Sequence, residues 1–230
     1  MSVLDIKSVS KSFDGIKIID NVSFSVGEGK IVGLLGKNGS GKSTVIKMIN
    51  DLLTIDAGEI LIKGEKISEK TKARVSYLPE RTYLDSAQTV SAIFDFFEDF
   101  YPDFDREKAR ALLADLDLDE NMKLSKMSKG MKEKVQLILV MSRTADLYIL
   151  DEPLGGVDPS TRDRIMKTIL SNFSEGSAML ITTHLIYDVE KILDEVVFID
   201  KGRIILSENA EELRERENSS IDEIFRRIVK

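Results

Sequence analysis

Residues 31–43 read IVGLLGKNGSGKS, an apolar run followed by a glycine-rich turn. Ile31–Leu35 is continuously apolar, as expected of a short strand that is buried on both faces. We predict a helix from about Lys42 to Asn50, so the turn lies between a strand and a helix. Gly36–Ser43 matches the pattern G-x-x-x-x-G-K-[ST], which holds phosphate in this structural context. The stretch therefore predicts a phosphate-binding loop in an α/β fold.

The residue types in this loop explain how it can hold a chain of phosphates. Glycines allow successive backbone N–H groups to turn inward, and the N-terminus of the helix adds a positive dipole. Lys42 is expected to reach the β- and γ-phosphates, and the Ser43 hydroxyl to ligate Mg²⁺. The alternative is a glycine-rich turn that matches the pattern by chance. The expected nucleotide contacts of the loop are Gly36, Asn38, Gly39, Ser40, Gly41, Lys42, Ser43 and Thr44.

A second candidate element is the sequence LYILDE at residues 147–152. Leu147–Leu150 reads as a buried strand, and the two acids follow at its carboxyl end, the edge at which open α/β sheets bind ligands. We expect Asp151 to hold Mg²⁺ through water and Glu152 to orient and deprotonate an attacking water. Alone, the pattern also describes a strand that ends at the surface. Its combination with the phosphate-binding loop favours the catalytic interpretation.

The composition excludes several other classes of protein. The chain has 230 residues, with 33 basic and 40 acidic side chains and a net charge of −7, so we expect no nucleic-acid partner. It has no cysteine and a single histidine, which excludes disulfide frameworks, thiol nucleophiles and sites with several histidines. No signal peptide is visible, and the longest apolar stretches are too short to cross a bilayer. We expect a cytosolic protein, held at a membrane only by a partner.

The order of the predicted elements indicates the fold class. The first 80 residues read as short strands and turns around one helix. Helical spacing dominates residues 89–143, and strands then alternate with helices again, which implies a mostly parallel, doubly wound sheet. We predict a core from residues 1–88 and 144–205 that includes a β subdomain, a helical subdomain at 89–143 and a helical tail at 206–230. Ile221, Ile224, Phe225 and Ile228 have the spacing of an amphipathic helix in that tail.

At this point the chain resembles the ATP-binding subunit of ABC transporters over nearly its whole length. That family carries a signature near L-S-G-G-Q, at the start of a helix shortly before the acidic strand. Residues 127–132 read MSKGMK here, so Ser128 and Gly130 match the signature while Lys129, Met131 and Lys132 depart from it. The form S-K-G-M-K is similar to the branch of ABC-2-type exporters associated with resistance to peptide antibiotics. Ser128 and Gly130 can offer donors to an anion, whereas the alternative is an ordinary N-cap serine.

The resemblance implies roles for three further positions. Phe13 stands where the family stacks an aromatic ring on adenine, although by itself it reads as a core residue. Residues 156–158 resemble the loop through which paired subunits communicate, and Asp158 before Pro159 is also a favourable helix N-cap. His184 follows a predicted strand at the position of the family's γ-phosphate switch. A lone histidine is otherwise more often a structural group.

One position departs from the family in a way that affects chemistry. Residues 77–80 read YLPE, and the family normally has glutamine at the last of these positions. Glu80 can still ligate a hard cation through oxygen. Its negative charge repels nucleotide in the absence of metal, so we hypothesise that nucleotide binding depends unusually strongly on Mg²⁺.

Aromatic residues are concentrated just after this position. Phe94, Phe96, Phe97, Phe100, Tyr101 and Phe104 lie within eleven residues, among several acids. One interpretation is a helix that packs the core of its own subdomain. However, aromatic residues at adjacent helical positions cannot all face one side. The other interpretation is that part of this segment grips a permease, as the resemblance implies.

The resemblance implies the fold and the activity. We expect an α/β P-loop NTPase fold with a mostly parallel core sheet, an N-terminal antiparallel β subdomain and an inserted α-helical subdomain. The expected activity is Mg²⁺-dependent ATP hydrolysis, with ATP bound between the Lys42 loop of one copy and Ser128–Gly130 of a second ATP-binding subunit. The expected partner is an integral-membrane permease at the inner face of the membrane. A soluble ABC protein and a binding module without hydrolysis remain alternatives, as do homodimer and heterodimer.

Overall fold

The centre of the protein is a six-stranded sheet. The computed structural model describes residues 1–155, 157–173 and 176–229. The strand order is β10-β9-β3-β8-β7-β6, and all neighbours are parallel except β10 and β9. The strands are β3 Ile31–Leu35, β6 Val75–Leu78, β7 Leu147–Asp151, β8 Ala178–Thr183, β9 Glu195–Asp200 and β10 Arg203–Asn209. The expected mostly parallel core sheet is confirmed.

Side chains of the parallel strands alternate between two hydrophobic clusters, one on each face of the sheet. In β3, Ile31 and Leu35 belong to one cluster, whereas Val32 and Leu34 belong to the other. This arrangement explains why the strand is apolar at every position, because neither face meets water. The same geometry brings the carboxyl ends of β3, β7 and β8 to one edge of the sheet.

A second sheet, which is antiparallel, is built mainly from the N-terminal residues. Its order is β2-β1-β4-β5, with the bounds Ser2–Phe13 for β1, Ile16–Gly27 for β2, Ala57–Ile62 for β4 and Glu65–Lys66 for β5. Helix α1 (Lys42–Ile49) packs between the two sheets, and its Val45, Ile46 and Met48 are buried in the cluster that the sheets share. The antiparallel sheet therefore fixes the helix that begins at the phosphate-binding loop.

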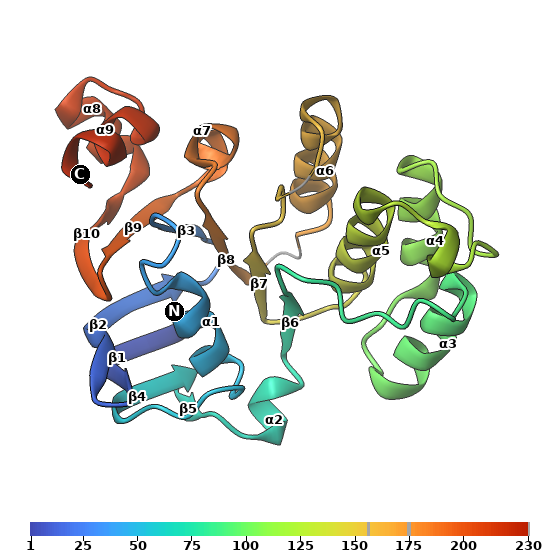
Figure 1. Cartoon of the computed structure of the whole chain (residues 1–230), viewed down its shortest axis with the longest axis horizontal. Coiled ribbons are helices and arrows are strands. Elements are labelled where there is room, and N and C mark those ends of the chain that lie inside the picture. The colour runs from blue at the N-terminus through green and yellow to red at the C-terminus, as the bar shows by residue number, and fades with distance from the viewer. Residues whose placement is uncertain (156, 174–175, 230) are drawn as a thin grey trace.

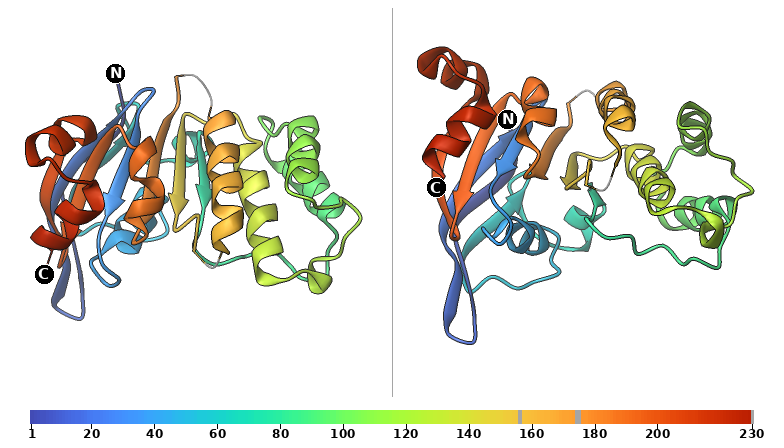
Figure 2. Two further views of the ribbon diagram at one scale, coloured as in Figure 1. Left: turned by 90° about the horizontal axis from the view of Figure 1, so that it is seen from above. Right: turned by 45° about the horizontal axis from the view of Figure 1, so that its top comes forward.

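The remaining long helices contribute side chains to the hydrophobic cluster on the other face of the central sheet. They are α3 Val90–Phe100, α4 Arg106–Asp115, α5 Lys129–Met141, α6 Pro159–Ser171, α8 Ala210–Glu217 and α9 Ile221–Ile228, with short α2 Glu69–Lys72 and α7 Ile186–Val189 and the 3₁₀ turns η1 Leu124–Lys126 and η2 Glu190–Ile192. Figures 1 and 2 show α3, α4 and α5 at one end of the molecule, and α8 and α9 at the opposite end. Within the described ranges, no helix has both the length and the apolar character needed to cross a membrane.

One part of the predicted organisation is wrong in detail. Residues 206–230 are not wholly helical, because 206–209 belong to strand β10 and the helices begin at Ala210. β10 is an antiparallel edge strand with exposed and half-buried residues alternating, so it lacks the apolar run that marks the central strands. The organisation of residues 1–230 as a single domain, with a core, a helical subdomain and a tail, remains a prediction.

Candidate functional site

A cavity of about 1020 Å³ opens between the phosphate-binding loop and the start of α5. Its lining includes most of the predicted loop residues, together with three predicted residues from other elements. The predicted residues that line it are Asn38, Gly39, Gly41, Lys42, Ser43, Thr44, Glu80, Glu152 and His184. The structure thus brings together, from four separate parts of the chain, residues that the sequence assigns to one site.

The Lys42 side chain forms hydrogen bonds with the backbone of the phosphate-binding loop. Lys42 Nζ donates to the carbonyl oxygens of Gly36 at 2.7 Å and of Lys37 at 3.3 Å, so the ammonium group lies inside the curve of the loop. Gly36 permits this curvature, because a Cβ there would lie 2.6 Å from the carbonyl oxygen of Ile199. Ser40 is buried, and its Oγ has no hydrogen-bond partner among the described residues. Ser40 does not line the cavity, and its Oγ packs against Gly36, so this hydroxyl is not among the groups that face the space for the phosphates.

Contacts with Lys42, Thr183 and His184 hold the Glu152 carboxylate in place. Its side chain is only 10% exposed, and one carboxylate oxygen lies 3.6 Å from Lys42 Nζ. The other accepts from Thr183 Oγ1 at 3.1 Å and from the His184 amide at 3.3 Å, and lies 2.9 Å from His184 Nδ1. The backbone of Glu152 has φ +52°, in the left-handed region that non-glycine residues rarely adopt. The turn after β7 therefore aims this carboxylate into the cavity at a conformational cost.

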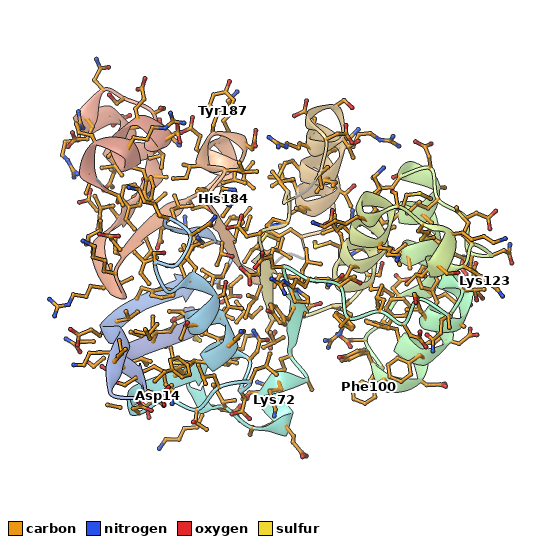
Figure 3. All side chains as sticks on the ribbon, viewed as in Figure 1. Asp14, Lys72, Phe100, Lys123, His184 and Tyr187 are labelled. Carbon is orange, nitrogen blue, oxygen red and sulfur yellow. The ribbon has the colours of Figure 1, made fainter. Side chains whose placement is uncertain are left out.

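The contact with Glu152 constrains the chemistry of His184. An ionised carboxylate only accepts hydrogen bonds, so the ring proton is assigned to Nδ1. A neutral ring then has an acceptor at Nε2. Donation of a hydrogen bond from His184 to a γ-phosphate oxygen therefore requires one of two changes. Either the imidazole ring is protonated, so that Nε2 also carries a proton, or the contact of Nδ1 with Glu152 is lost. His184 itself is exposed on the cavity side of β8 (Figure 3).

Asp151 lies one residue earlier, beneath the cavity. It is buried, and its Oδ1 accepts from Thr182 Oγ1 at 2.5 Å. Burial raises the pKa of Asp151, and the nearby Glu152 and Glu80 carboxylates raise it further, against the hydrogen bond from Thr182 and the charge of Lys42. The carboxyl edge of the sheet therefore concentrates negative charge that a bound cation would relieve.

The donor set fits the Mg²⁺ ion that the sequence predicts. The described residues contain no group of three acidic or histidine side chains able to hold an ion by themselves. Magnesium in nucleotide sites is usually held by one or two carboxylates together with phosphate oxygens. Asp151, Glu80 and the Ser43 hydroxyl offer oxygen ligands of this type, beside the cavity that would hold the phosphates.

Several residues of the cavity wall were not predicted. Ile18 comes from β2, Arg81 and Thr82 follow Glu80, and Lys129 and Glu133 lie on the first turns of α5. Burial raises the pKa of Glu133, although Lys129 lies 3.6 Å away. Ile18 and Glu133 reach the cavity from distant segments, so no spacing in the sequence indicates them. Arg81, Thr82 and Lys129 had a local signal, since they adjoin the predicted residues Glu80 and Ser128.

Seven predicted residues do not line this cavity: Gly36, Ser40 and Asp151 belong to the loop and strand end described above, and four others lie elsewhere. Ser128 is the N-cap of α5 and accepts from the Met131 amide at 3.2 Å, and Gly130 is half-buried in the same turn. Asp158 is exposed and caps α6 through the Thr161 amide at 3.1 Å, while its neighbour Gly156 lies outside the described residues. Phe13 adjoins the turn of the β1–β2 hairpin, and Figure 3 places its neighbour Asp14 far from His184. The nucleotide roles of these four residues remain predictions.

Comparison with known proteins identifies the family. A family model described as ABC transporter matches residues 19–155. The chain is 30% identical over 216 residues to the ABC transporter ATP-binding protein YtrB of Bacillus subtilis (strain 168), an alignment that covers 93% of this chain and 74% of that protein. It is also 30% identical over 225 residues to the lipopolysaccharide export system ATP-binding protein LptB of Haemophilus influenzae, covering 93% of each chain. A solved structure described as the ATP-binding subunit of an ABC transporter superposes with a TM-score of 0.90 at 27% identity, covering 99% of this chain and 100% of that one. The protein with this loop, sheet edge and cavity therefore belongs to the ABC transporter family, as an ATP-binding domain with the P-loop NTPase fold.

Proposed function

We propose that this ATP-binding subunit hydrolyses ATP in a Mg²⁺-dependent reaction and thereby powers a membrane permease. The observation that carries the proposal is the Glu152 carboxylate, which projects into the cavity beside Lys42 and His184. A carboxylate at this position can accept a proton from a water molecule that attacks the γ-phosphate. Lys42 and the loop amides would hold the phosphates, and Ser43, Asp151 and Glu80 would hold the metal. Bound Mg²⁺ would neutralise charge that develops on the phosphate oxygens.

Dimerisation of two such domains is the second part of the proposal. Ser128 and Gly130 at the start of α5 do not line the cavity of their own chain, although Lys129 between them does. A donor-rich helix start of this kind can serve an anion that another copy presents. We propose a head-to-tail pair, in which each ATP contacts the loop of one copy and the Ser128–Gly130 segment of the other. Asp158 would lie on the same interface.

The proposed partner is the permease of an ABC-2-type exporter. The S-K-G-M-K form of the signature supports this branch, and one relative, LptB, is named for an export system. The aromatic residues between Phe94 and Phe104 would supply the docking surface for this permease. Phe94 and Phe97 are buried, but Phe96 is 58% and Phe100 64% exposed, and their rings stack with centroids 5.9 Å apart. Exposed, paired aromatic rings are typical of protein contacts. The permease would hold this chain at the inner face of the membrane.

The hydrolytic role is tested by replacing Glu152 with glutamine. The wild type should hydrolyse Mg-ATP, and Glu152→Gln should slow turnover by roughly 100-fold or more, because loss of a general base costs this much. The affinity of the variant for Mg-ATP, measured by titration calorimetry, should stay close to that of the wild type.

Asp146→Asn is the matched control. Asp146 directly precedes β7, at the end of the strand opposite to Glu152, and pairs with Lys63 at 2.7 Å. The control should retain wild-type turnover. If the wild type binds Mg-ATP but shows no turnover, the chain is a nucleotide-gated binding module and the enzymatic proposal is wrong.

A further inference from the structure

The turn between β9 and β10 touches the phosphate-binding loop from outside the nucleotide cavity. The Gly202 amide donates to the Ser40 carbonyl oxygen at 2.9 Å, and the Gly202 carbonyl accepts from the Asp20 amide at 2.9 Å. One residue near the end of the chain thus joins the phosphate-binding loop to strand β2. Figure 1 shows this hairpin lying against β2.

The position admits only glycine. Gly202 has φ +75°, and a Cβ there would lie 2.0 Å from the carbonyl oxygen of Ile18. The loop side of the contact is equally tight, because a Cβ on Gly41 would lie 2.6 Å from the side chain of Ile19 and 3.6 Å from Gly202 Cα. Since backbone atoms form the closest contact of Gly202, a rotamer change cannot relieve it.

An ion pair between Arg203 and Asp20 also stabilises the turn between β9 and β10. Arg203 lies at the start of β10, and its Nε donates to Asp20 Oδ2 at 2.8 Å while Nη2 lies 2.5 Å from the same oxygen. Lys17 donates to the other oxygen of Asp20 at 2.8 Å. Asp20 therefore ties β2 to β10 through both its backbone amide and its side chain.

We infer that the turn at Gly202 is a positioning element for the nucleotide phosphates and for the Ile18 wall of the cavity. In a trans peptide the C=O and the next N–H point in opposite directions. Holding the Ser40 carbonyl on Gly202 therefore sets the direction of the Gly41 N–H, and Gly41 lines the cavity. The same turn presses on Ile18, which forms part of the wall. This inference rests on the proposed nucleotide site.

Gly202→Ala tests the inference, with Gly64→Ala as a matched control. Gly64 has φ +76°, but a Cβ there would meet nothing within 4 Å. Both variants therefore carry the same backbone penalty, and only Gly202→Ala puts a Cβ against the backbone of Ile18 and so shifts the turn that holds the Ser40 carbonyl. We expect Gly202→Ala to weaken Mg-ATP binding by about tenfold and to raise KM, with kcat changed by less than about threefold, because the turn does not contact Glu152 or His184. Gly64→Ala should bind Mg-ATP like the wild type.

Equal affinities of folded Gly202→Ala and Gly64→Ala would overturn the inference, as would a fall in kcat with KM unchanged. If the wild type does not bind Mg-ATP, the proposed function fails instead, so the two failures are distinguishable.

Asp20→Ala decides the question if Gly202→Ala does not fold. Removing a negative charge near the loop should by itself strengthen the binding of an anionic nucleotide. Loss of the turn's anchor predicts the opposite sign, a weakening of about two- to fivefold. An unchanged or stronger affinity in Asp20→Ala would contradict the inference.

Discussion

Glu80 lies at the cavity wall, close enough to Asp151 for its charge to raise the pKa of that acid. Burial raises the pKa of Tyr77, and Asp151 and Glu80 contribute to the same direction of shift. The structure therefore places the unusual carboxylate in the acidic group at the carboxyl edge of the sheet. With glutamine at this position, as is usual in the family, one negative charge fewer would face the phosphates.

This extra charge predicts a strong dependence of nucleotide binding on metal. We expect Glu80→Gln to strengthen the binding of ATP in chelator by roughly tenfold, since a charge several ångströms away is worth about 1–2 kcal/mol at a protein surface. The affinity for Mg-ATP should change much less, because the metal compensates the charge. Titration calorimetry with and without Mg²⁺ measures both affinities.

Glu69→Gln, at an exposed position on α2, provides the control for the loss of one negative charge. An affinity in chelator that is the same for the wild type and Glu80→Gln would show that Glu80 does not oppose metal-free nucleotide.

At the scale of single elements, Ser128 combines a structural role with a proposed functional one. The Ser128 hydroxyl caps α5 by accepting from the Met131 amide, which needs no nucleotide. The proposed role in a dimer requires the same residue to face the phosphates of a second copy. Aspartate separates the two roles, because it caps a helix as well as serine does but repels an anion.

Ser128→Asp should therefore keep the thermal stability of the wild type and lose turnover by roughly 100-fold, or about 2.7 kcal/mol. Ser220→Asp makes the same change at the N-cap of α9 and should alter neither property. Melting curves and ATPase assays on the three proteins give the comparison. A wild-type ATPase rate in Ser128→Asp would contradict the proposed dimer contact and would leave Ser128 only its role as a helix cap.

The elements that could be predicted from the sequence are those with a strong local signal. Ile31–Leu35 was predicted with its observed bounds, because a strand buried on both faces has an apolar residue or glycine at every position. β10 was not predicted, since an edge strand needs no such run. α8 falls within the helical tail predicted for residues 206–230, although its mostly charged surface gave no periodic signal for a separate helix. Short β5 and α2 lack any periodic signal.

The residues of the site also fall into two groups, those that a local sequence signal indicates and those that only tertiary packing brings to the cavity. Glu152 and His184 stand directly after β7 and β8, and Lys42 begins the helix that follows β3, so their meeting follows from parallel topology. Ile18 and Glu133 reach the cavity from a hairpin and from the helical segment, and only the packing of those parts brings them there. The assignment of Phe13 and Asp158 depends on a nucleotide and a second copy, which a single chain does not supply.

At the scale of the whole molecule, one hydrophobic cluster joins the helical segment to the central sheet. It contains Phe94 and Phe97 of α3 together with Leu35 of β3 and Phe198 of β9. The buried Arg143 also stabilises the contact between the helical segment and the central sheet, because it pairs with Asp103 at 3.1 Å and donates to the Val75 carbonyl at 2.8 Å. Force applied to α3 by a partner would therefore be carried directly to the strands that bear the site.

The exposed aromatic pair on α3 is the proposed point of contact for the permease, and Figure 3 shows Phe100 at the edge of the molecule. We expect Phe96→Ser together with Phe100→Ser to release the chain from the membrane fraction of its native cells, while ATPase activity stays within about twofold, because the pair lies outside the cavity. Fractionation of a tagged chain measures the first effect.

Ile205→Ser is the control, since Ile205 is exposed on β10 at the opposite end of the molecule. The acid Asp95, also on α3, is a less suitable position for this test, because it pairs with Arg106 at 2.5 Å within the helical segment itself. Membrane association that survives the double substitution would place the permease contact elsewhere.

The pairing of Lys42 with Glu152 has a consequence for the order of events. The Lys42 ammonium group donates to two carbonyl oxygens and lies 3.6 Å from the Glu152 carboxylate. An incoming phosphate competes for that ammonium and so loosens its hold on Glu152. Under the proposed function, substrate binding thereby frees the Glu152 carboxylate to accept a proton from the water that attacks the γ-phosphate, so the base becomes available only when its substrate is present.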